Sequence, residues 1–439
     1  MSIELNHNCR DALVRKLAGA LAKINIKNGK FLDLTSVTDL FAADEVLPHH
    51  GEVRTLLNEY ISDQPVTDFT IDTLHSELRD LDDYKTEPAM MPLSQVDGFH
   101  DCENVAKSLV TKLQSLPWRY VLTIRLPFEI SNFFSEGHAE HELSPSLRIL
   151  PAQRVAEQFP LSTSNSARLR QFEQPVNALL GSLRGGERLP LKWPDQGALL
   201  QLDALGFIGP FGTTAPYVTA EHSLKAFFGL GIALLMFRAR HVWSPWPFKN
   251  QIYVHRQNDE VWELEDRLDV DDDKSRALDS MRMNTEQFSE KLMKAWVPKA
   301  LEQMRAVFSA GSKSKNIQLA CQWLYEAHTA RNDLSRYVNA MVVLEILLGE
   351  SGREDVSLSE LLRNRCAYLI GRNRQERDEL LRDFQQIYKV RSLILHRGKP
   401  LLTAGERRLL WRLLSICHQV IQREVELLVA DPKPKELAG

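Results

Sequence analysis

The chain has 439 residues, of which 44% are apolar and 26% charged, and its formal net charge is −4. This composition excludes a disordered chain, and the length predicts two or three domains rather than a single core. The slightly acidic balance gives no indication of a nucleic-acid partner by itself.

Cysteine usage and hydropathy indicate where the protein works. The five cysteines are dispersed and form no CxxC pair, which argues against a disulfide framework and a zinc knuckle. The N-terminal sequence lacks the apolar segment of a signal peptide. The longest apolar run, residues 226–237, is shorter than the roughly 20 residues of a membrane span and is expected to be a buried helix. We therefore expect a cytoplasmic protein with no membrane partner.

The first two thirds of the chain combine helical and strand-like patterns. Residues 1–115 carry mainly helical periodicity, and residues 116–270 contain runs rich in β-branched and aromatic residues, punctuated by Pro and Gly. A strong helix candidate spans 219–243, with Thr219 as its N-cap. Residues 259–273 hold nine carboxylates and one arginine. The run "QIYVHRQNDEVWELED", 251–266, is strand-like, and "DVDDD", 269–273, is expected to be an acidic linker rather than a cation site.

The last third of the chain is helical in pattern. A polar break at 311–316 is the expected domain boundary. Amphipathic segments joined by short loops follow it and predict a helical bundle; they are 317–330, 335–350, 358–371, 374–396 and 404–430. The predicted fold class is α+β and multidomain. An N-terminal mixed α/β region, 1–310, is either one domain or two, helical 1–115 and β-rich 116–310, and an all-α bundle covers 311–439.

Several patterns in the N-terminal region weakly resemble metal-binding or phosphate-binding motifs. "GHAEHE", residues 137–142, offers His138 and His141 at a spacing that a metal could use, but it lacks the flanking pattern of a zinc-protease helix. The glycine-rich stretches "GSLRGGERLP" and "GPFGTT" lack the ending of a P-loop and are expected to be turns. We expect no metal and no cofactor.

The bundle carries a concentrated positive charge. Residues 363–423 contain fourteen Lys and Arg but five Asp and Glu, so this segment has a net charge of +9 and the rest of the chain −13. A basic field on an otherwise acidic protein suits a polyanion such as RNA. Solvent-exposed helix faces rich in arginine explain the same count equally well.

Three residues of the bundle carry the chemistry. Glu345 lies inside "MVVLEILL" and needs a partner, because an unpaired charge in an apolar setting is costly. Arg391 and His396 lie in "YKVRSLILH", and Glu345 is a candidate to orient one of them. Gly398 and Pro400 in "HRGKP" predict a helix end, which places His396 in the last turn. The helix dipole favours an imidazolium there.

These residues resemble a known family. "RSLILH" fits the R-x4-6-H motif of HEPN domains, and the wider order of "CQWLYEA", "VLEILLG", "LLRNRCAYLIG" and "FQQIYKVRSLILHRG" is similar to the Apea-like HEPN subgroup. The resemblance covers about 316–430. Many active members carry Asn, Asp or His directly after the arginine, whereas this chain has Ser392, as is common in the Apea-like subgroup.

The resemblance implies a homodimeric, metal-independent endoribonuclease acting on RNA such as tRNA, in antiphage defence, abortive infection or a toxin–antitoxin system. His396 would be the acid/base and Arg391 the phosphate clamp, supported by Glu345, Tyr388 and Ser392. Lys389, Arg397 and Lys399 would contact RNA, and the N-terminal region would respond to a phage-derived trigger or an antitoxin protein. The alternative is a non-catalytic HEPN dimerisation or binding module, acting as a sensor or adaptor for RNA, nucleotide or a partner protein.

Overall fold

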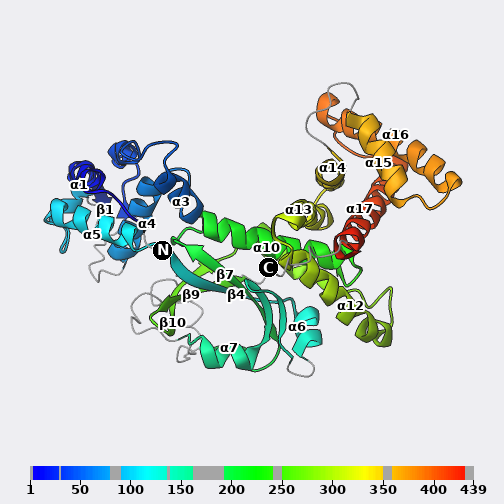
Figure 1. The fold of residues 1–439 in the computed structure, drawn as a ribbon, viewed down its shortest axis with the longest axis horizontal. Coiled ribbons are helices and arrows are strands. Elements are labelled where there is room, and N and C mark those ends of the chain that lie inside the picture. Colours follow the sequence, from blue (N-terminus) through cyan, green and yellow to red (C-terminus); the bar gives the residue numbers. More distant parts are fainter. Residues whose placement is uncertain are drawn as a thin grey trace, which may run out of the picture.

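The computed structural model describes residues 3–28, 31–79, 90–135, 139–161, 192–240, 250–349 and 358–430. The protein is mixed α/β, with its sheets in the N-terminal two thirds and a helical region at the C-terminal end (Figure 1). This coarse order confirms the predicted sequence of a mixed region followed by helices.

The first 116 residues build a small unit with its own core. Its helices surround a three-stranded antiparallel sheet of order β2-β1-β3; the elements are α1 (His7–Leu21), β1 (Asn25–Lys27), β2 (Phe31–Leu32), α2 (Phe41–Asp44), α3 (Glu52–Tyr60), α4 (Pro65–Arg79), β3 (Met90–Pro92) and α5 (Cys102–Gln114). Leu17, Phe69 and Leu109 are buried together in that core. The helical expectation for this segment is thus met, with a small sheet added to it.

A six-stranded antiparallel sheet occupies the middle of the molecule. Its order is β10-β9-β4-β7-β6-β5, with β4 at Trp118–Arg125, β5 at His141–Ser144, β6 at Leu147–Pro151, β7 at Ala198–Gly206, β9 at Gln251–Asn258 and β10 at Val261–Asp269. Two short helices, α6 (Phe128–Ser135) and α7 (Ala152–Gln158), follow β4 and β6. The strand-rich expectation for 116–270 is therefore confirmed.

The acidic segment 259–273 confirms the predicted strand up to residue 266 and corrects the predicted linker at 269–273. Most of it forms β10, which pairs with β9 as a hairpin and buries Leu264 and Leu268. The remainder starts helix α11 (Asp272–Asp279), and Asp271 caps that helix by accepting hydrogen bonds from the amides of Asp273 and Lys274. Leu264 and Leu268 hold the strand against the core, and the shielded carboxylates between them are paired: Glu265 with Arg256 and Asp266 with Arg79.

The helix predicted over 219–243 is shifted towards the N-terminus. Helix α10 spans Ala215–Ala233, so Thr219 lies within it, and Thr214 occupies the N-cap position that we had assigned to Thr219. Pro216 fits the first turn, where its missing N–H costs nothing. The helix ends because Leu235 takes a φ of 59°, and the chain then enters β8 (Phe237–Ala239), which pairs with β11 (Met281–Met283).

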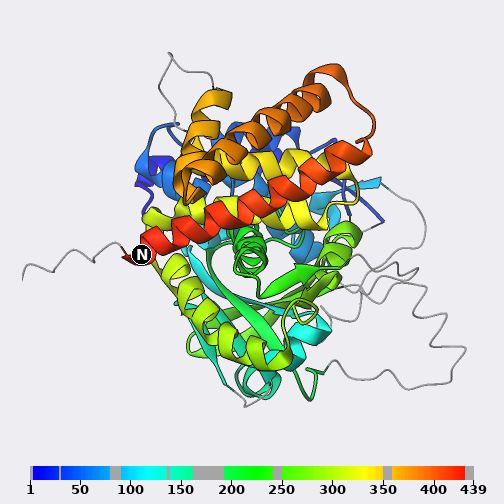
Figure 2. The same ribbon diagram turned by 90° about the vertical axis from the view of Figure 1, so that its right-hand side faces the viewer.

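Helix α10 is the central element of the molecule. Figure 2 shows it end-on, in green, between the curved sheet and the long red helix α17. It crosses α13 so closely that a Cβ built on Gly229 would lie 1.8 Å from the carbonyl oxygen of Cys321. Glycine is therefore required at that crossing, since any side chain would separate the two helices.

The five predicted C-terminal helices are present. After α12 (Glu290–Ser309) they are α13 (Lys315–Thr329), α14 (Asp333–Leu348), α15 (Leu358–Ile370), α16 (Arg374–Arg397) and α17 (Ala404–Ala430). The polar break at 311–316 is a short helical turn at Gly311–Ser314 running into α13. One apolar core continues from the sheet through α10 into these helices. The domain boundary at 311 stays a prediction, and the two sides share a core across it.

Candidate functional site: the outer end of helix α16

Helix α16 lies at the outer edge of the helical region, away from the sheet (Figure 1). It begins at the N-cap Asn373, whose side chain accepts from the amide of Glu376, and its inner face buries Leu380, Phe384 and Val390. It ends at Gly398, which has a φ of 59° and a ψ of 38°. The predicted left-handed cap is confirmed, and His396 lies in the last turn as expected.

Arg391 faces inward from α16 towards α14. Its guanidinium donates to the Glu345 carboxylate, with 2.9 Å between Nη2 and Oε1, and it lies 5.5 Å from the centroid of the Tyr388 ring. The side chains of Arg391 and Glu345 are 20% and 23% exposed, so the ion pair is largely shielded from water. The predicted need of Glu345 for a partner is met by Arg391, and the aromatic ring adds a cation–π contact.

His396 faces the opposite way. Its side chain is exposed and has no hydrogen-bond or ion-pair partner within the described residues. Five positions along a regular helix rotate a side chain by about 140° and move it about 7.5 Å along the axis. One chain therefore directs Arg391 towards α14 and His396 towards solvent, and it brings Tyr388 and Glu345 to the arginine alone. Ser392 is half-buried beside them.

A stripe of positive charge leads along α16 to His396. Arg382, Lys389 and His396 are spaced by seven residues, so they lie within about 40° of one another around the helix, each about 10 Å from the next. All three are exposed and, within the described part of the chain, unpaired. Lys389 was predicted from the sequence. Arg382 was missed, although its seven-residue spacing from Lys389 is visible in the sequence.

The two other predicted RNA contacts differ from each other. Arg397 is exposed, next to His396. Lys399 is already paired, with 3.1 Å between its ammonium and the Glu406 carboxylate. Burial alone would raise the pKa of Glu406, but hydrogen bonds from Thr403 and Lys399 outweigh it and lower that pKa. Lys399 therefore stabilises the start of α17, where Thr403 and Glu406 form a capping box.

Only part of the basic segment 363–423 presents free charge. The cations that pair with a carboxylate of the described residues include Arg363, Arg374, Arg391, Lys399, Arg407, Arg412 and Arg423. Cations that are exposed and lack a partner among the described residues include Arg372, Arg382, Lys389, Arg397 and Arg408. Three of these five lie on α16, so the unpaired charge concentrates on that helix.

A large cleft lies at the other end of α16. It has a volume of about 760 Å³ and is bounded by the end of α15, the start of α16 and α17. Arg377 and Arg423 line it together with Glu376, Glu379 and Glu426, so both signs of charge are present. The last cleft residue on α16 is Leu380, 16 residues before His396, which corresponds to about 24 Å along the helix axis. The cleft is therefore separate from the R-x4-H pair.

Of the candidate metal ligands His138 and His141, the structure describes His141. Among the residues that the structure describes, no three His, Cys, Asp or Glu side chains group as metal ligands. His138 and the stretch 181–190 lie outside the described residues. His141 is on β5 against the edge of Phe134, and burial, together with nearby Arg305, lowers its pKa.

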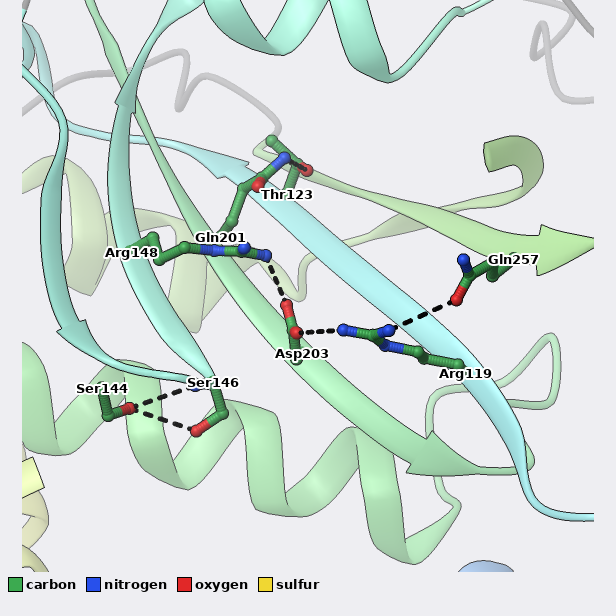
Figure 3. A network of polar contacts seen from close by, with 8 residues as sticks. All are labelled: Arg119, Thr123, Ser144, Ser146, Arg148, Gln201, Asp203 and Gln257. Carbon is green, nitrogen blue, oxygen red and sulfur yellow. Dashed lines mark hydrogen bonds and ion pairs between the residues drawn. The ribbon is translucent and has the colours of Figure 1, made fainter. Parts of the chain in front are cut away.

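A polar network lies on the sheet (Figure 3). Asp203 on β7 pairs with Arg148 at 2.6 Å and with Arg119 at 3.5 Å, and Arg119 also reaches Gln257 on β9. These residues alternate with Leu200 and Leu202, which face α10, so the network lies on the far face of the sheet. It joins neighbouring strands and has a carboxylate shared between two cations, which is a structural arrangement rather than a reactive one.

Comparison with known proteins identifies no relative. No protein-family model, no curated protein and no solved structure matches the chain. No helix in the described ranges has the length and apolar character needed to cross a bilayer.

Proposed function

We propose that the protein is a metal-independent endoribonuclease whose reaction takes place at the outer end of α16. His396 is the general acid/base and Arg391 the phosphate clamp, as in the HEPN domains that the C-terminal sequence resembles. Tyr388, Ser392 and Glu345 position the arginine. By the same resemblance, the role is antiphage defence by abortive infection or a toxin-type function, with residues 1–310 controlling the nuclease.

The chemistry requires no metal because RNA carries its own nucleophile. The 2′-oxygen loses its proton and attacks the adjacent phosphorus, and the bond from phosphorus to the 5′-oxygen breaks. The departing 5′-oxygen takes up a proton, leaving a 2′,3′-cyclic phosphate and a 5′-hydroxyl. A histidine at a helix C-terminus can exchange both protons, and an arginine stabilises the charge that builds on the phosphate oxygens.

The observation that carries the proposal is the stripe formed by Arg382, Lys389 and His396. Cations without carboxylate partners are available to phosphates, and a row of them leads a single strand along α16. The stripe ends at the one residue in it that can transfer protons near neutral pH. The surface therefore supports RNA binding in a register that delivers a phosphate to His396.

A second copy of the chain would complete the site. Arg391 and His396 diverge around the helix, so a partner's motif is needed to surround one phosphate. Leu395 and Leu401, which are 46% and 73% exposed, flank His396 and offer an apolar surface for self-association. A homodimer formed there would bring two R-x4-H pairs into one cleft.

One observation favours the second candidate, a non-catalytic binding module. Glu345 already neutralises Arg391, and a guanidinium held by a carboxylate binds phosphate less strongly than a free one. In that case the same stripe would bind RNA without cleaving it.

Cleavage assays separate the two candidates. Purified wild type, Arg391→Ala and His396→Ala are incubated with tRNA and with total RNA in EDTA. The nuclease proposal predicts cleavage by wild type and its loss in both variants. Cleavage that persists in both variants, or that requires a metal, contradicts the assignment, and binding without cleavage under every activating condition identifies the binding module.

A further inference from the structure

A cavity that opens to solvent beside Asp273 and Arg331 lies between the sheet and the helices, away from the end of α16. Its volume is about 330 Å³, which is within the range of small-molecule sites. Its walls come from strands β4 and β9 and from helices α10, α11, α13 and α14. A molecule bound there would touch both the sheet and the C-terminal helices.

One side of the cavity is apolar. Ile124 and Ile252 project from the sheet, Leu224 from α10, and Leu278 from α11, with Val270 between β10 and α11. Aliphatic side chains from three directions provide a surface on which a flat ring can be buried, and burying apolar area is the main source of affinity in such sites.

The charged residues of the cavity neutralise one another. On α10, Glu221 lies 2.7 Å from Lys274 and 3.0 Å from Lys225, and Lys225 lies 2.7 Å from Glu326 on α13. Glu221 and Lys225 are 14% and 20% exposed. Burial by itself would raise the pKa of Glu221, but the two lysines outweigh it and lower that pKa, so the carboxylate stays ionised.

The remaining charged pair completes the balance. Asp273 on α11 pairs with Arg331, which follows α13, and both line the cavity. The lining thus has three cations and three anions, all paired. Lys274, Asp273 and Arg331 are 50%, 66% and 61% exposed at the mouth, whereas Glu221 and Lys225 are the shielded charges. A charged group placed beside Glu221 and Lys225 would leave a charge uncompensated where shielding makes that costly, so the inner part of the cavity favours an uncharged molecule.

Two tyrosines supply unused hydrogen-bonding groups. Tyr217 and Tyr325 line the cavity and are only 8% and 6% exposed, yet neither hydroxyl has a hydrogen-bond partner among the described residues. Burial, with nearby Glu221, raises the pKa of Tyr217 to about 12, so its hydroxyl keeps its proton and can donate. Both tyrosines line the cavity, so a ligand there would replace water as the hydrogen-bond partner of their hydroxyls. Ser335 and the Asn339 amide add further neutral polar groups to the lining.

We propose that this cavity binds an uncharged ring-bearing molecule of the nucleoside type. The ring lies against the aliphatic side chains, and the hydroxyl and amide groups of the ligand bond to Tyr217 and Tyr325. A phosphorylated form is disfavoured because the lysines and the arginine are already neutralised. This site and its ligand are independent of the RNA reaction at α16.

The test is titration calorimetry of the full chain with adenosine, guanosine, cytidine and uridine, each compared with its 5′-monophosphate. At least one nucleoside is expected to bind saturably, and its monophosphate to bind at least about tenfold more weakly. Tyr217→Phe and Tyr325→Phe keep the rings and remove the hydroxyls, and each should weaken binding about three- to tenfold. Because these hydroxyls are unpaired, neither change should lower the melting temperature.

Tyr337→Phe is the matched control. The Tyr337 hydroxyl donates to the carbonyl of Ile387 at 3.0 Å, outside the cavity, so this variant should melt at a lower temperature and bind the nucleoside as wild type does. The proposal is overturned if no nucleoside binds at about 1 mM, the weak end of measurable affinity. It is equally overturned if a monophosphate binds as tightly as its nucleoside, or if both tyrosine variants bind as wild type does.

Discussion

The outer end of α16 and the cavity beside α10 handle charge in opposite ways. On α16, Arg382, Lys389 and His396 face solvent without carboxylate partners among the described residues. In the cavity, Lys225 lies between the carboxylates of Glu221 and Glu326. Unpaired surface cations attract a polyanion, whereas a cavity whose charges are already paired disfavours a ligand with a net charge. The two regions are therefore suited to ligands of different kinds, and each can be tested without the other.

The largest expected effect is the pH dependence of stability that comes from His328 and His418. His328 and His418 lie 2.9 Å apart between α13 and α17, and burial lowers the pKa of His418 to about 4. An unfolded histidine titrates near 6.5, so between pH 6.5 and 4 the unfolded state binds more protons. The free energy of unfolding should fall by about 2–3 kcal/mol over that range as pH decreases.

Urea unfolding at several pH values measures this slope. His418→Gln should flatten it, and His396→Gln, which changes an exposed side chain, should leave it as in wild type. An unchanged slope in His418→Gln would show that the inner pair does not remain neutral on acidification.

The Glu345–Arg391 ion pair should matter more than a surface pair. Glu345→Gln leaves the largely shielded Arg391 without a counter-charge and should lower the free energy of unfolding by about 2 kcal/mol. Glu426→Gln breaks the exposed pair between Glu426 and Arg423 on α17 and should cost less than about 0.5 kcal/mol. Equal costs would mean that the α14–α16 contact does not shield the arginine.

The stripe on α16 should determine RNA affinity and its salt dependence. Removing two phosphate contacts with the double change Arg382→Ala and Lys389→Ala should weaken binding of single-stranded RNA about tenfold and reduce the salt slope by about 1.4. Fluorescence anisotropy at several salt concentrations measures both quantities. Arg423→Ala, which removes a paired cation, is the control, and a similar loss in that variant would indicate diffuse attraction instead of a stripe.

The smallest expected effect tests the helix end that presents His396. No atom lies within 4 Å of a Cβ built on Gly398, so Gly398→Ala meets backbone strain alone and should cost about 1 kcal/mol. Gly405, in the first turn of α17, also has free space and an ordinary φ, and Gly405→Ala should stabilise by up to about 1 kcal/mol. Thermal unfolding of both variants gives the comparison, and a stabilising Gly398→Ala would contradict the left-handed cap.

The sequence predicts local features of the helical region well. The end of α16 at Gly398 follows from one glycine, and the pairing of Glu345 follows from its apolar neighbours. The prediction of a linker at 269–273 was wrong because Asp271 caps α11 and Asp272 and Asp273 begin it, which a run of carboxylates does not reveal by composition. The predicted C-terminal end of helix α10 was too late, because its apolar run continues past Ala233 while the backbone turns at Leu235.

The cavity could not be predicted from the sequence. Its lining comes from residues between Ile124 and Asn339 that become neighbours when the sheet packs against α10 and α13. Tyr217 and Tyr325 have the sequence pattern of ordinary core aromatics, and their position at a cavity, without partners for their hydroxyls in the described ranges, is a property of the tertiary structure. The motif on α16 lies within a single segment, and that is why it is visible before folding.

The chemistry of the RNA ends tests the central claim most directly. Wild type is incubated with a 5′-labelled RNA in EDTA, and the product termini are identified by mass spectrometry. Attack by the 2′-hydroxyl predicts 2′,3′-cyclic phosphate and 5′-hydroxyl ends, and His396→Ala should yield neither. Products with 3′-hydroxyl and 5′-phosphate ends, or products that form only after a divalent metal is added, would contradict a metal-independent reaction at the end of α16.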